Sequence, residues 1–280
     1  MTAPILQITD LTRNFGGVVA VNGFNMTVEH GMIAGLIGPN GAGKTTVFNT
    51  VSGFYRPNAG RIVFEGRDIT GSPAHRICRY GIARTFQNIR LFGNATAVEN
   101  VMVGGHVRRK KQWWMPLVFW PGVMEEERSI RSRAEELIRR VDLERYRNEK
   151  AGALPYGAQR RLEIARALAT EPTFLLLDEP AAGMNPQETE ELMQFIKRLR
   201  DEFGLTILLI EHDMKVVMGV CERIWVLDYG RLIAEGDAER IQRDQRVIEA
   251  YLGDSIDAAA DGGGERAGAG PESGTEGESC

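Results

Sequence analysis

The amino-acid sequence predicts an α/β fold with a mixed or parallel sheet core, and three observations lead to that prediction. After residue 173, continuous apolar runs such as "FLLLD" and "TILLIE" alternate with helical patterns, which is typical of parallel strands covered by helices on both faces. Before residue 65, short β-rich runs are separated by glycine-containing turns, which favours an antiparallel β subdomain. Between these parts, a charged and mostly helical segment predicts an inserted helical subdomain.

The N-terminal part contains the first predicted strands. The turns "FGG" and "EHG" divide the β-rich runs, and glycine permits the backbone conformations that tight turns need. A helix is expected from Lys44 toward Ser52, and the letters "EGRD" after the last of these strands are expected to form a turn. The expected strands are Ile5–Asp10, Asn25–Val28, Met32–Ile37 and Arg61–Phe64.

The segment from Val98 to Lys150 is charged and mostly helical in pattern. Within it, "MEEERSIRSRAEELIRRVDL" places apolar residues at helical spacing along one face. We therefore expect a helical subdomain at about residues 96–165, inserted into the α/β body. The apolar positions of this stretch are Ile130, Ala134, Leu137, Ile138 and Val141.

Strand and helix patterns alternate again after Thr173. A helix is expected after Pro186 and another from Met214, and "RIWVLD" reads as a further strand. From Asp254 the chain consists mainly of Gly, Ala, Ser and acidic residues without any aromatic residue, which is too little apolar surface to offset the entropy of ordering. We therefore predict one domain at 1–253 and a disordered acidic tail at 254–280.

Composition narrows the class of protein. The chain has 34 Lys and Arg residues against 38 Asp and Glu residues, so net charge gives no reason to expect a nucleic-acid partner, which usually requires a basic face. The cysteines lack metal-ligand spacing and the amino terminus lacks the apolar core of a signal peptide, so a reduced cytoplasmic setting is expected. No apolar run approaches the roughly 20 residues that span a bilayer.

A glycine-rich segment, "GPNGAGKT" at 38–45, predicts a phosphate-binding loop. It has the spacing G-x-x-x-x-G-K-[ST] and lies between a predicted strand and a predicted helix. Its backbone N–H groups would face nucleotide phosphates, Lys44 would reach the β and γ phosphates, and Thr45 would hold Mg²⁺. The alternative is a glycine-rich turn with a surface lysine. The candidate phosphate-binding residues are Gly38, Pro39, Asn40, Gly41, Ala42, Gly43, Lys44, Thr45 and Thr46.

Two carboxylates follow the apolar strand of "FLLLDEP" at 174–180. Alone they also fit a purely structural reading, since buried strands often end in acids. Together with the phosphate loop, they become a Mg²⁺-positioning Asp178 and a Glu179 placed to polarise the attacking water. After the next strand, His212 in "EHD" is a candidate contact for the γ-phosphate, although a histidine at a strand end is more often structural.

The order of these motifs resembles a known family. The stretch "LPYGAQRR" at 154–161 stands where ABC (ATP-binding cassette) ATPases carry the signature "LSGGQ". With the phosphate loop, Gln87, "LLLDEP" and His212 in family order, the resemblance extends to about Leu252. It implies a P-loop NTPase cassette that hydrolyses ATP with Mg²⁺.

The resemblance assigns roles to further residues. Gln87, in "ARTFQNIRLF", would belong to the catalytic and Mg²⁺-sensing loop that faces a transmembrane partner. Phe15 resembles the aromatic residue that stacks on adenine, and it could equally be a buried strand residue. In the dimer that this family forms, the signature of one subunit closes over ATP held by the other. The signature residues assigned to that contact are Pro155, Tyr156, Gly157 and Gln159.

Longer segments narrow the resemblance to one group. "GIARTFQNIRLF", "DEPAAGMNP", "LLIEHDMKVVMGV" and "VIEAYLG" resemble the ATP-binding subunit of branched-chain amino-acid importers, which shares the signature without serine. The likeness implies a peripheral subunit on the cytoplasmic face of the inner membrane. Its implied partners are two transmembrane permease subunits, a second ABC ATPase subunit, identical or different, and indirectly an extracytoplasmic substrate-binding protein.

Other functions stay open at this point. Urea and lipopolysaccharide transporters use similar ATPases, and some ABC ATPases act on nucleic acids without a membrane channel. The letters "RRKK" at 108–111, followed by Trp113 and Trp114, fit a nucleic-acid patch, a surface for lipid headgroups and a membrane partner, or a solvated loop. The chain lacks the long coiled coils, tandem cassettes and strongly basic arms of the nucleic-acid class, so a transporter without a nucleic-acid partner is preferred.

Overall fold

The computed structural model describes residues 3–108 and 121–251, and its core is a six-stranded mixed sheet. The strand order is β10-β9-β3-β8-β7-β6, in which β10 alone is antiparallel to its neighbour. The α/β prediction with a mixed sheet is therefore confirmed. The strands are β3 (Ile33–Ile37), β6 (Ile82–Arg84), β7 (Phe174–Asp178), β8 (Thr206–Ile210), β9 (Arg223–Asp228) and β10 (Arg231–Gly236).

A second, antiparallel sheet has the order β2-β1-β4-β5. Its first strands are longer than the sequence predicts, because bulges interrupt the pairing of β1 with β2 and so break the alternation that marks a strand. The letters "EGRD" also do more than turn, since Arg67 and Asp68 pair with β4. The strands are β1 (Leu6–Phe15), β2 (Val18–Val28), β4 (Ala59–Phe64) and β5 (Arg67–Asp68).

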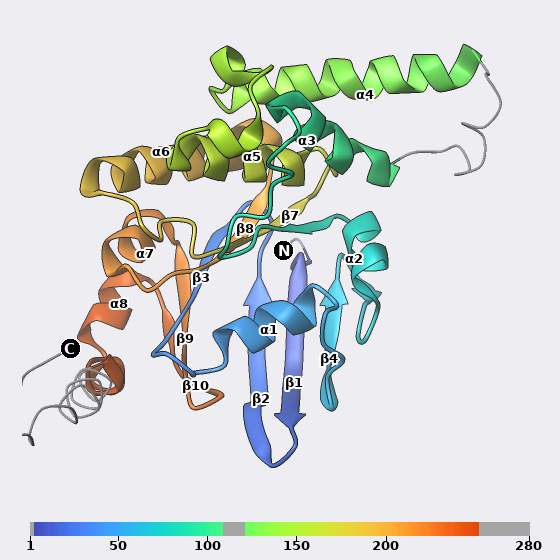
Figure 1. Cartoon of the computed structure of the whole chain (residues 1–280). Coiled ribbons are helices and arrows are strands. Elements are labelled where there is room, and N and C mark those ends of the chain that lie inside the picture. The colour runs from blue at the N-terminus through green and yellow to red at the C-terminus, as the bar shows by residue number, and fades with distance from the viewer. Residues whose placement is uncertain (1–2, 109–120, 252–280) are drawn as a thin grey trace, which may run out of the picture.

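Helices surround the mixed sheet. Figure 1 shows α3 to α6 above the sheets, α7 and α8 beside β9 and β10, and α1 in front of β1 and β2. The α-helices are α1 (Lys44–Val51), α2 (Ala74–Tyr80), α3 (Ala97–Gly105), α4 (Pro121–Arg140), α5 (Tyr156–Leu168), α6 (Pro186–Phe203), α7 (Met214–Val220) and α8 (Ala238–Arg243). Short 3-10 helices are η1 (His106–Arg108), η3 (Glu144–Tyr146) and η4 (Ala151–Ala153).

Both faces of the mixed sheet are covered, as the apolar runs predict. On β3, Ile33 and Ile37 pack into one core with the helices α3 to α7. Ala34 and Leu36 point to the opposite face and join a second core with α1 and the antiparallel sheet. Because successive side chains of a strand point to opposite faces, this buries β3 along its whole length and fixes the position of the loop that follows it.

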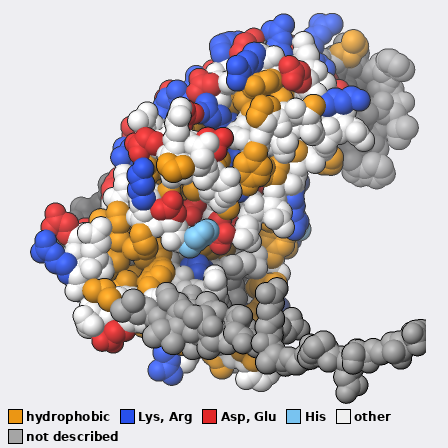
Figure 2. Space-filling model, turned by 60° about the vertical axis from the view of Figure 1, so that its left-hand side comes forward, with side chains coloured by type: hydrophobic (Ala, Val, Ile, Leu, Met, Phe, Trp, Pro, Cys, Tyr) orange, Lys and Arg blue, Asp and Glu red, His pale blue; other side chains and the backbone are white. Residues whose placement is uncertain are grey.

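The middle of the chain is helical, as expected. The predicted apolar positions of α4 and the turn after it are buried, with Ile130 partly buried. The boundary of 96–165 for a subdomain stays a prediction, and the "RRKK" and tryptophan letters and the tail from 254 fall mostly or wholly outside the described residues. Figure 2 shows Lys and Arg side chains interspersed with Asp and Glu side chains over the upper, helical part of the molecule. None of the described helices is long and apolar enough to cross a membrane.

Candidate functional site

The mixed sheet brings the predicted motifs to one edge. Ile210 of β8 lies beside Leu36 of β3 on one side and beside Asp178 of β7 on the other. All three strands are parallel, so the loops that follow them leave the sheet at the same level. The phosphate loop after β3, Glu179 after β7 and His212 after β8 therefore meet at the carboxyl edge of the sheet.

The phosphate loop (Gly38–Thr45) connects β3 to α1. Gly38, Gly41 and Gly43 have φ angles of 147°, 78° and 103°, a region that favours glycine. Gly43 is the N-cap residue of α1 and makes no side-chain hydrogen bond to it, and a helix start of this kind favours an anion. Lys44 is 8% exposed, and its Nζ donates to the carbonyl oxygens of Gly38 at 2.6 Å and Pro39 at 2.8 Å.

The carboxylate of Glu179 is the centre of a polar cluster. Its Oε2 accepts a hydrogen bond of 2.8 Å from Gln87 Nε2 and lies 3.8 Å from His212 Nδ1. Glu179 adopts a φ of 45°, and its N–H donates to the carbonyl of Ile210 at 2.9 Å. A positive φ in a non-glycine residue is uncommon and costs energy, so the surrounding structure must hold the backbone of Glu179 in this conformation.

Asp178 has a partner, Arg84, that the sequence did not indicate. Its Oδ2 accepts from Arg84 at 2.7 Å, and both side chains are 7% exposed. Arg84 is the last residue of the short edge strand β6, and all residues of β6 pair with β7. The predicted metal-positioning carboxylate therefore lies in a buried ion pair.

Glu211, between β8 and His212, is a second residue whose role the sequence did not indicate. It is fully buried, and its Oε1 accepts from the N–H of Ala181 at 2.7 Å. Burial raises the pKa of this carboxyl, although hydrogen bonds from the N–H groups of Ala181, Asp213 and His212 oppose the rise. Glu211 thus holds the chain after Glu179 against the end of β8.

We expect Glu211→Gln to change the pH dependence of stability. Because the pKa of Glu211 is raised in the folded protein from its ordinary value of 4.5, folding favours its protonated form. That contribution to the free energy of unfolding is complete below pH 4.5 and is lost as pH rises through the raised pKa. The melting temperature of the wild type, relative to Glu211→Gln, should therefore fall as pH rises.

The measurement is a series of thermal melts from acid to neutral pH. Glu202→Gln is the matched control, because Glu202 is exposed on α6. A difference between wild type and Glu211→Gln that stays constant with pH would contradict the prediction.

The signature segment opens α5. Pro155 is the N-cap residue, with φ −55° and no side-chain hydrogen bond to the helix. Tyr156 donates its hydroxyl to the carbonyl of Ala182 at 3.0 Å, and Gln159 Nε2 donates to the carbonyl of Leu154 at 2.8 Å. A Cβ at Gly157 would meet nothing within 4 Å, so this chain leaves the helix start open at that residue.

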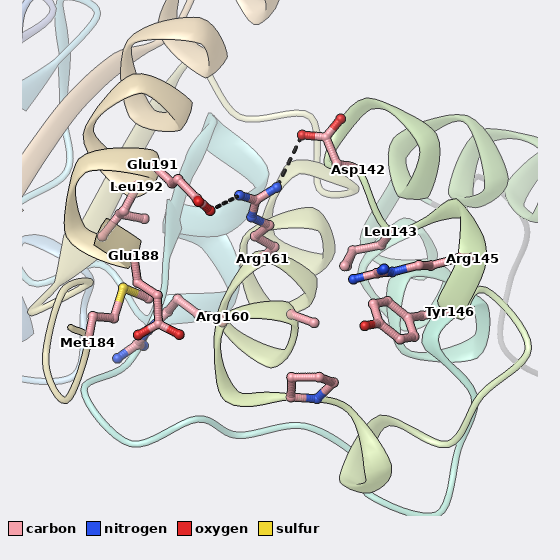
Figure 3. A pocket seen from close by; sticks show the side chains of 13 residues that line it. Asp142, Leu143, Arg145, Tyr146, Arg160, Arg161, Met184, Glu188, Glu191 and Leu192 are labelled. Atoms are coloured by element: carbon pink, nitrogen blue, oxygen red, sulfur yellow. Dashed lines mark hydrogen bonds and ion pairs between the residues drawn. The ribbon is translucent and has the colours of Figure 1, made fainter. Parts of the chain in front are cut away.

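Pro155 and Gly157 line a cavity of about 420 Å³ between α5, η3 and α6. Figure 3 shows Arg161 reaching across it toward Asp142 and Glu191. The two ion pairs measure 3.1 Å and 3.7 Å. They connect α5 to the turn after α4 and to α6, and so fix the orientation of the signature helix.

Arg160 connects the signature helix to the loops that carry Gln87 and Glu179, a role that the sequence did not indicate. Its guanidinium is completely buried beside Glu163, at 3.0 Å. It donates to the carbonyls of Phe86 at 2.8 Å, Gln87 at 3.0 Å and Glu179 at 3.2 Å. Burial raises the pKa of Glu163, and the charge of Arg160 opposes that rise. One side chain therefore connects three segments that carry candidate site residues.

Phe15 ends β1 and is 39% exposed, so the alternative of a buried strand residue is wrong. Its ring meets Tyr55 edge to face with centroids 5.1 Å apart, and the Arg13 guanidinium lies 4.5 Å from its centre. Contact with adenine stays a prediction.

Known proteins resemble the chain over most of its length. A family model described as ABC transporter matches residues 21–182, and one described as branched-chain amino acid ATP-binding cassette transporter matches residues 231–257. The chain is 48% identical to the high-affinity branched-chain amino acid transport ATP-binding protein BraF of Pseudomonas aeruginosa, over 91% of this chain and 100% of BraF. It is 45% identical to the corresponding protein LivG of Escherichia coli, with the same coverage.

Solved structures agree with this relationship. The ADP conformation of MJ1267, an ATP-binding cassette of an ABC transporter, matches with a TM-score of 0.79 and 31% identity, over 90% of this chain and 100% of MJ1267. The dimeric ABC transporter cassette MJ0796 matches with a TM-score of 0.70 and 26% identity, over 83% and 98%. On these similarities, and on the phosphate loop, signature helix and carboxylate strand that its sheet assembles, the chain belongs to the ATP-binding cassette ATPases of ABC transporters.

Proposed function

We propose that this chain is the ATP-hydrolysing subunit of a membrane importer for branched-chain or related amino acids. The single observation that carries the proposal is the similarity to BraF and LivG along 91% of the chain. The match of residues 231–257 to the branched-chain cassette model supports the same substrate class. The test is uptake of radiolabelled leucine by cells that lack the chain. Wild type should restore uptake and Glu179→Gln should not. Failure of the wild type to restore uptake would overturn the proposal, whereas restoration by both would remove only the role of Glu179.

The donor set at the sheet edge fits ATP with Mg²⁺. A buried ammonium, an uncapped helix start and a hydroxyl suit phosphate oxygens, whereas carboxylate, hydroxyl and amide oxygens suit Mg²⁺. Lys44 would bind the β and γ phosphates in exchange for the two carbonyls that it now contacts. Thr45, Asp178 and Gln87 would hold Mg²⁺, which supplies charge neutralisation on the phosphates when bound.

Glu179 is the proposed general base. A carboxylate at this position accepts the proton of the attacking water, and the hydrogen bond from Gln87 orients it. His212 is 62% exposed beside Glu179 and would contact the γ-phosphate. The Gln87 loop therefore adjoins the residue that acts on water.

A groove behind the Gln87 loop is the proposed docking site for a permease subunit. It has a volume of about 370 Å³ and is lined mostly by apolar residues, among them Phe54, Phe86 and Phe92, with the charged Arg84, Glu163 and Arg166 beside them. Phe54 and Phe92 are 53% and 56% exposed, and exposed apolar patches mark interaction sites. A permease helix inserted into this groove would contact Phe86. Because Phe86 precedes Gln87, which donates a hydrogen bond to Glu179, docking of the permease would be coupled to ATP hydrolysis. The resulting complex would place the chain at the cytoplasmic face of the inner membrane beside a second ABC subunit, identical or different.

Two phenylalanine variants should separate nucleotide binding from docking. Phe15→Ala is expected to weaken ATP affinity about tenfold, because a stacked base contributes roughly 1–3 kcal/mol, and to leave tripolyphosphate affinity unchanged. Phe92→Ala is the matched control for nucleotide binding and should lower leucine uptake instead. Fluorescence titration and uptake assays measure the two effects. Equal ATP affinities of the two variants would contradict a contact between Phe15 and adenine. Normal leucine uptake with Phe92→Ala would contradict permease docking in the groove.

A further inference from the structure

Arg84 connects the Asp178 carboxylate to the helix of the phosphate loop. Its Nη2 donates to Asp178 Oδ2 at 2.7 Å, while Nη1 donates to Asn49 Oδ1 at 2.7 Å and to Ser52 Oγ at 3.1 Å. Asn49 lies in the last turn of α1 and Ser52 is its C-cap residue. One guanidinium therefore binds a side chain at the end of β7 and two at the end of α1.

Aromatic rings surround the Arg84 guanidinium on the sides that its polar partners leave free. The rings of Phe48, Phe86 and Phe54 lie 5.6 Å, 5.3 Å and 5.9 Å from the guanidinium carbon, and the side chain is 7% exposed. Water is largely excluded, so the polar contacts of this guanidinium are strong and directional. A guanidinium is also planar, with donors in a fixed fork, whereas an ammonium is a single point charge. A lysine at this position could not bind Asp178 and the end of α1 at once in the same geometry.

Stability alone is a poor reason for this arrangement. A buried ion pair often stabilises a protein no more than apolar side chains of similar volume would. The Nε of Arg84 is buried and has no hydrogen-bond partner among the described residues, which adds a cost. Apolar packing already joins α1 to the sheet, since Phe48 and Val51 share a core with Leu176 of β7.

We propose that Arg84 is a positioning residue of the ATPase reaction, which holds the Asp178 carboxylate at a fixed place relative to α1 and so shapes the magnesium site between them. This inference rests on the proposed role of Asp178. Thr45, another proposed ligand, lies in the first turn of α1, and Arg84 contacts the opposite end of that helix. An ionised carboxylate accepts through two oxygens, so a bond from Arg84 to Oδ2 is compatible with a cation on Oδ1.

The test measures metal affinity separately from nucleotide affinity in the full chain. Arg84→Lys keeps the charge and loses the fork, and Asn49→Ala removes one of the two contacts with the end of α1 while the contact with Ser52 stays. Arg61→Lys is the matched control, because Arg61 pairs with Asp68 at 2.9 Å on the surface. Metal affinity is measured by electron paramagnetic resonance of Mn²⁺ in the presence of ATP. Nucleotide affinity is measured with fluorescent ATP in EDTA.

Arg84→Lys is expected to weaken Mn²⁺ binding about 10- to 100-fold, the effect of one hydrogen bond to a charged group, and to leave ATP affinity in EDTA unchanged. Asn49→Ala should act in the same direction with a smaller loss, and it carries the test if Arg84→Lys does not fold. Unchanged Mn²⁺ affinity, or an equal loss of both affinities, overturns the role of Arg84. If Asp178→Asn itself binds Mn²⁺ like wild type, the proposed role of Asp178 fails instead.

Discussion

Replacement of Glu179 by glutamine should slow ATP hydrolysis by about 10²- to 10⁴-fold, the usual cost of losing a general base, with ATP affinity retained. The reason is geometric as well as chemical. Glutamine keeps the size of the side chain and an oxygen that can accept the 2.8 Å hydrogen bond from Gln87. What it loses is the basic carboxylate, so the attacking water is not deprotonated. Phosphate release and fluorescent ATP binding measure the two quantities.

Glu190→Gln is the matched control, because Glu190 lies on α6 and its side chain is 52% exposed beside Lys215. Its hydrolysis rate should equal that of the wild type. If Glu179→Gln hydrolysed ATP within about threefold of wild type, far outside the range for a general base, Glu179 would not be the base and the water would have to be activated elsewhere.

The positions of the phosphate loop, Glu179 and His212 could be predicted from the sequence, because they depend on strand order and little else. Each motif follows a continuous apolar run, and apolar runs of this kind form parallel strands whose carboxyl ends share one edge. The structure follows this rule, because Ile210 of β8 pairs with Leu36 of β3 on one side and with Asp178 of β7 on the other. The resemblance to a known family then added the roles of Gln87 and the signature.

Arg84, Arg160 and Glu211 could not be predicted in the same way. Arg84 ends a strand of three residues, which is too short for a periodic pattern to reveal. Arg160 and Glu163 have the i, i+3 spacing typical of a solvated helical ion pair, and only tertiary packing places both at 1% exposure or less. Charged residues are rarely buried, so the sequence favours the wrong environment for all three.

The limits of the first strands could not be predicted from the sequence either, because bulges interrupt their pairing. The expected strands near the amino terminus stop where bulges begin, between Ile8 and Leu11 and again after Leu11. Two residues then oppose one on the partner strand, and the inside-outside alternation changes phase. Local pattern therefore located the strands and did not give their length.

The signature segment at 154–161 is expected to control how strongly this chain dimerises on ATP. At the N-cap of α5, Pro155 has neither a hydroxyl nor an N–H, and its carbonyl already accepts from Gln159 at 3.0 Å. The neighbouring Gly157 is open to an approaching group. A phosphate held by a second subunit can therefore contact the N–H groups of the helix start and receives nothing from the side chain of Pro155.

We predict that this chain alone dimerises weakly on ATP and that its physiological partner is a different cassette subunit whose signature contains serine. That serine would complete the site at Lys44, and the site completed by Pro155 would be the less effective of the two. Pro155→Ser in the Glu179→Gln background should tighten ATP-driven homodimerisation about 10- to 100-fold, since a hydrogen bond to a charged group contributes roughly 1.5–3 kcal/mol.

Sedimentation with and without ATP measures the effect, and Pro155→Ala is the matched control. Alanine restores the N–H and removes the ring without adding a hydroxyl, so only the difference between serine and alanine reports the missing contact. Serine also caps a helix, which by itself adds about 1 kcal/mol of stability, and thermal melts without ATP account for that part. If serine and alanine variants dimerise equally, or if the chain with Pro155 already forms a tight ATP-bound homodimer, the backbone N–H groups suffice and the two sites of the dimer need not differ.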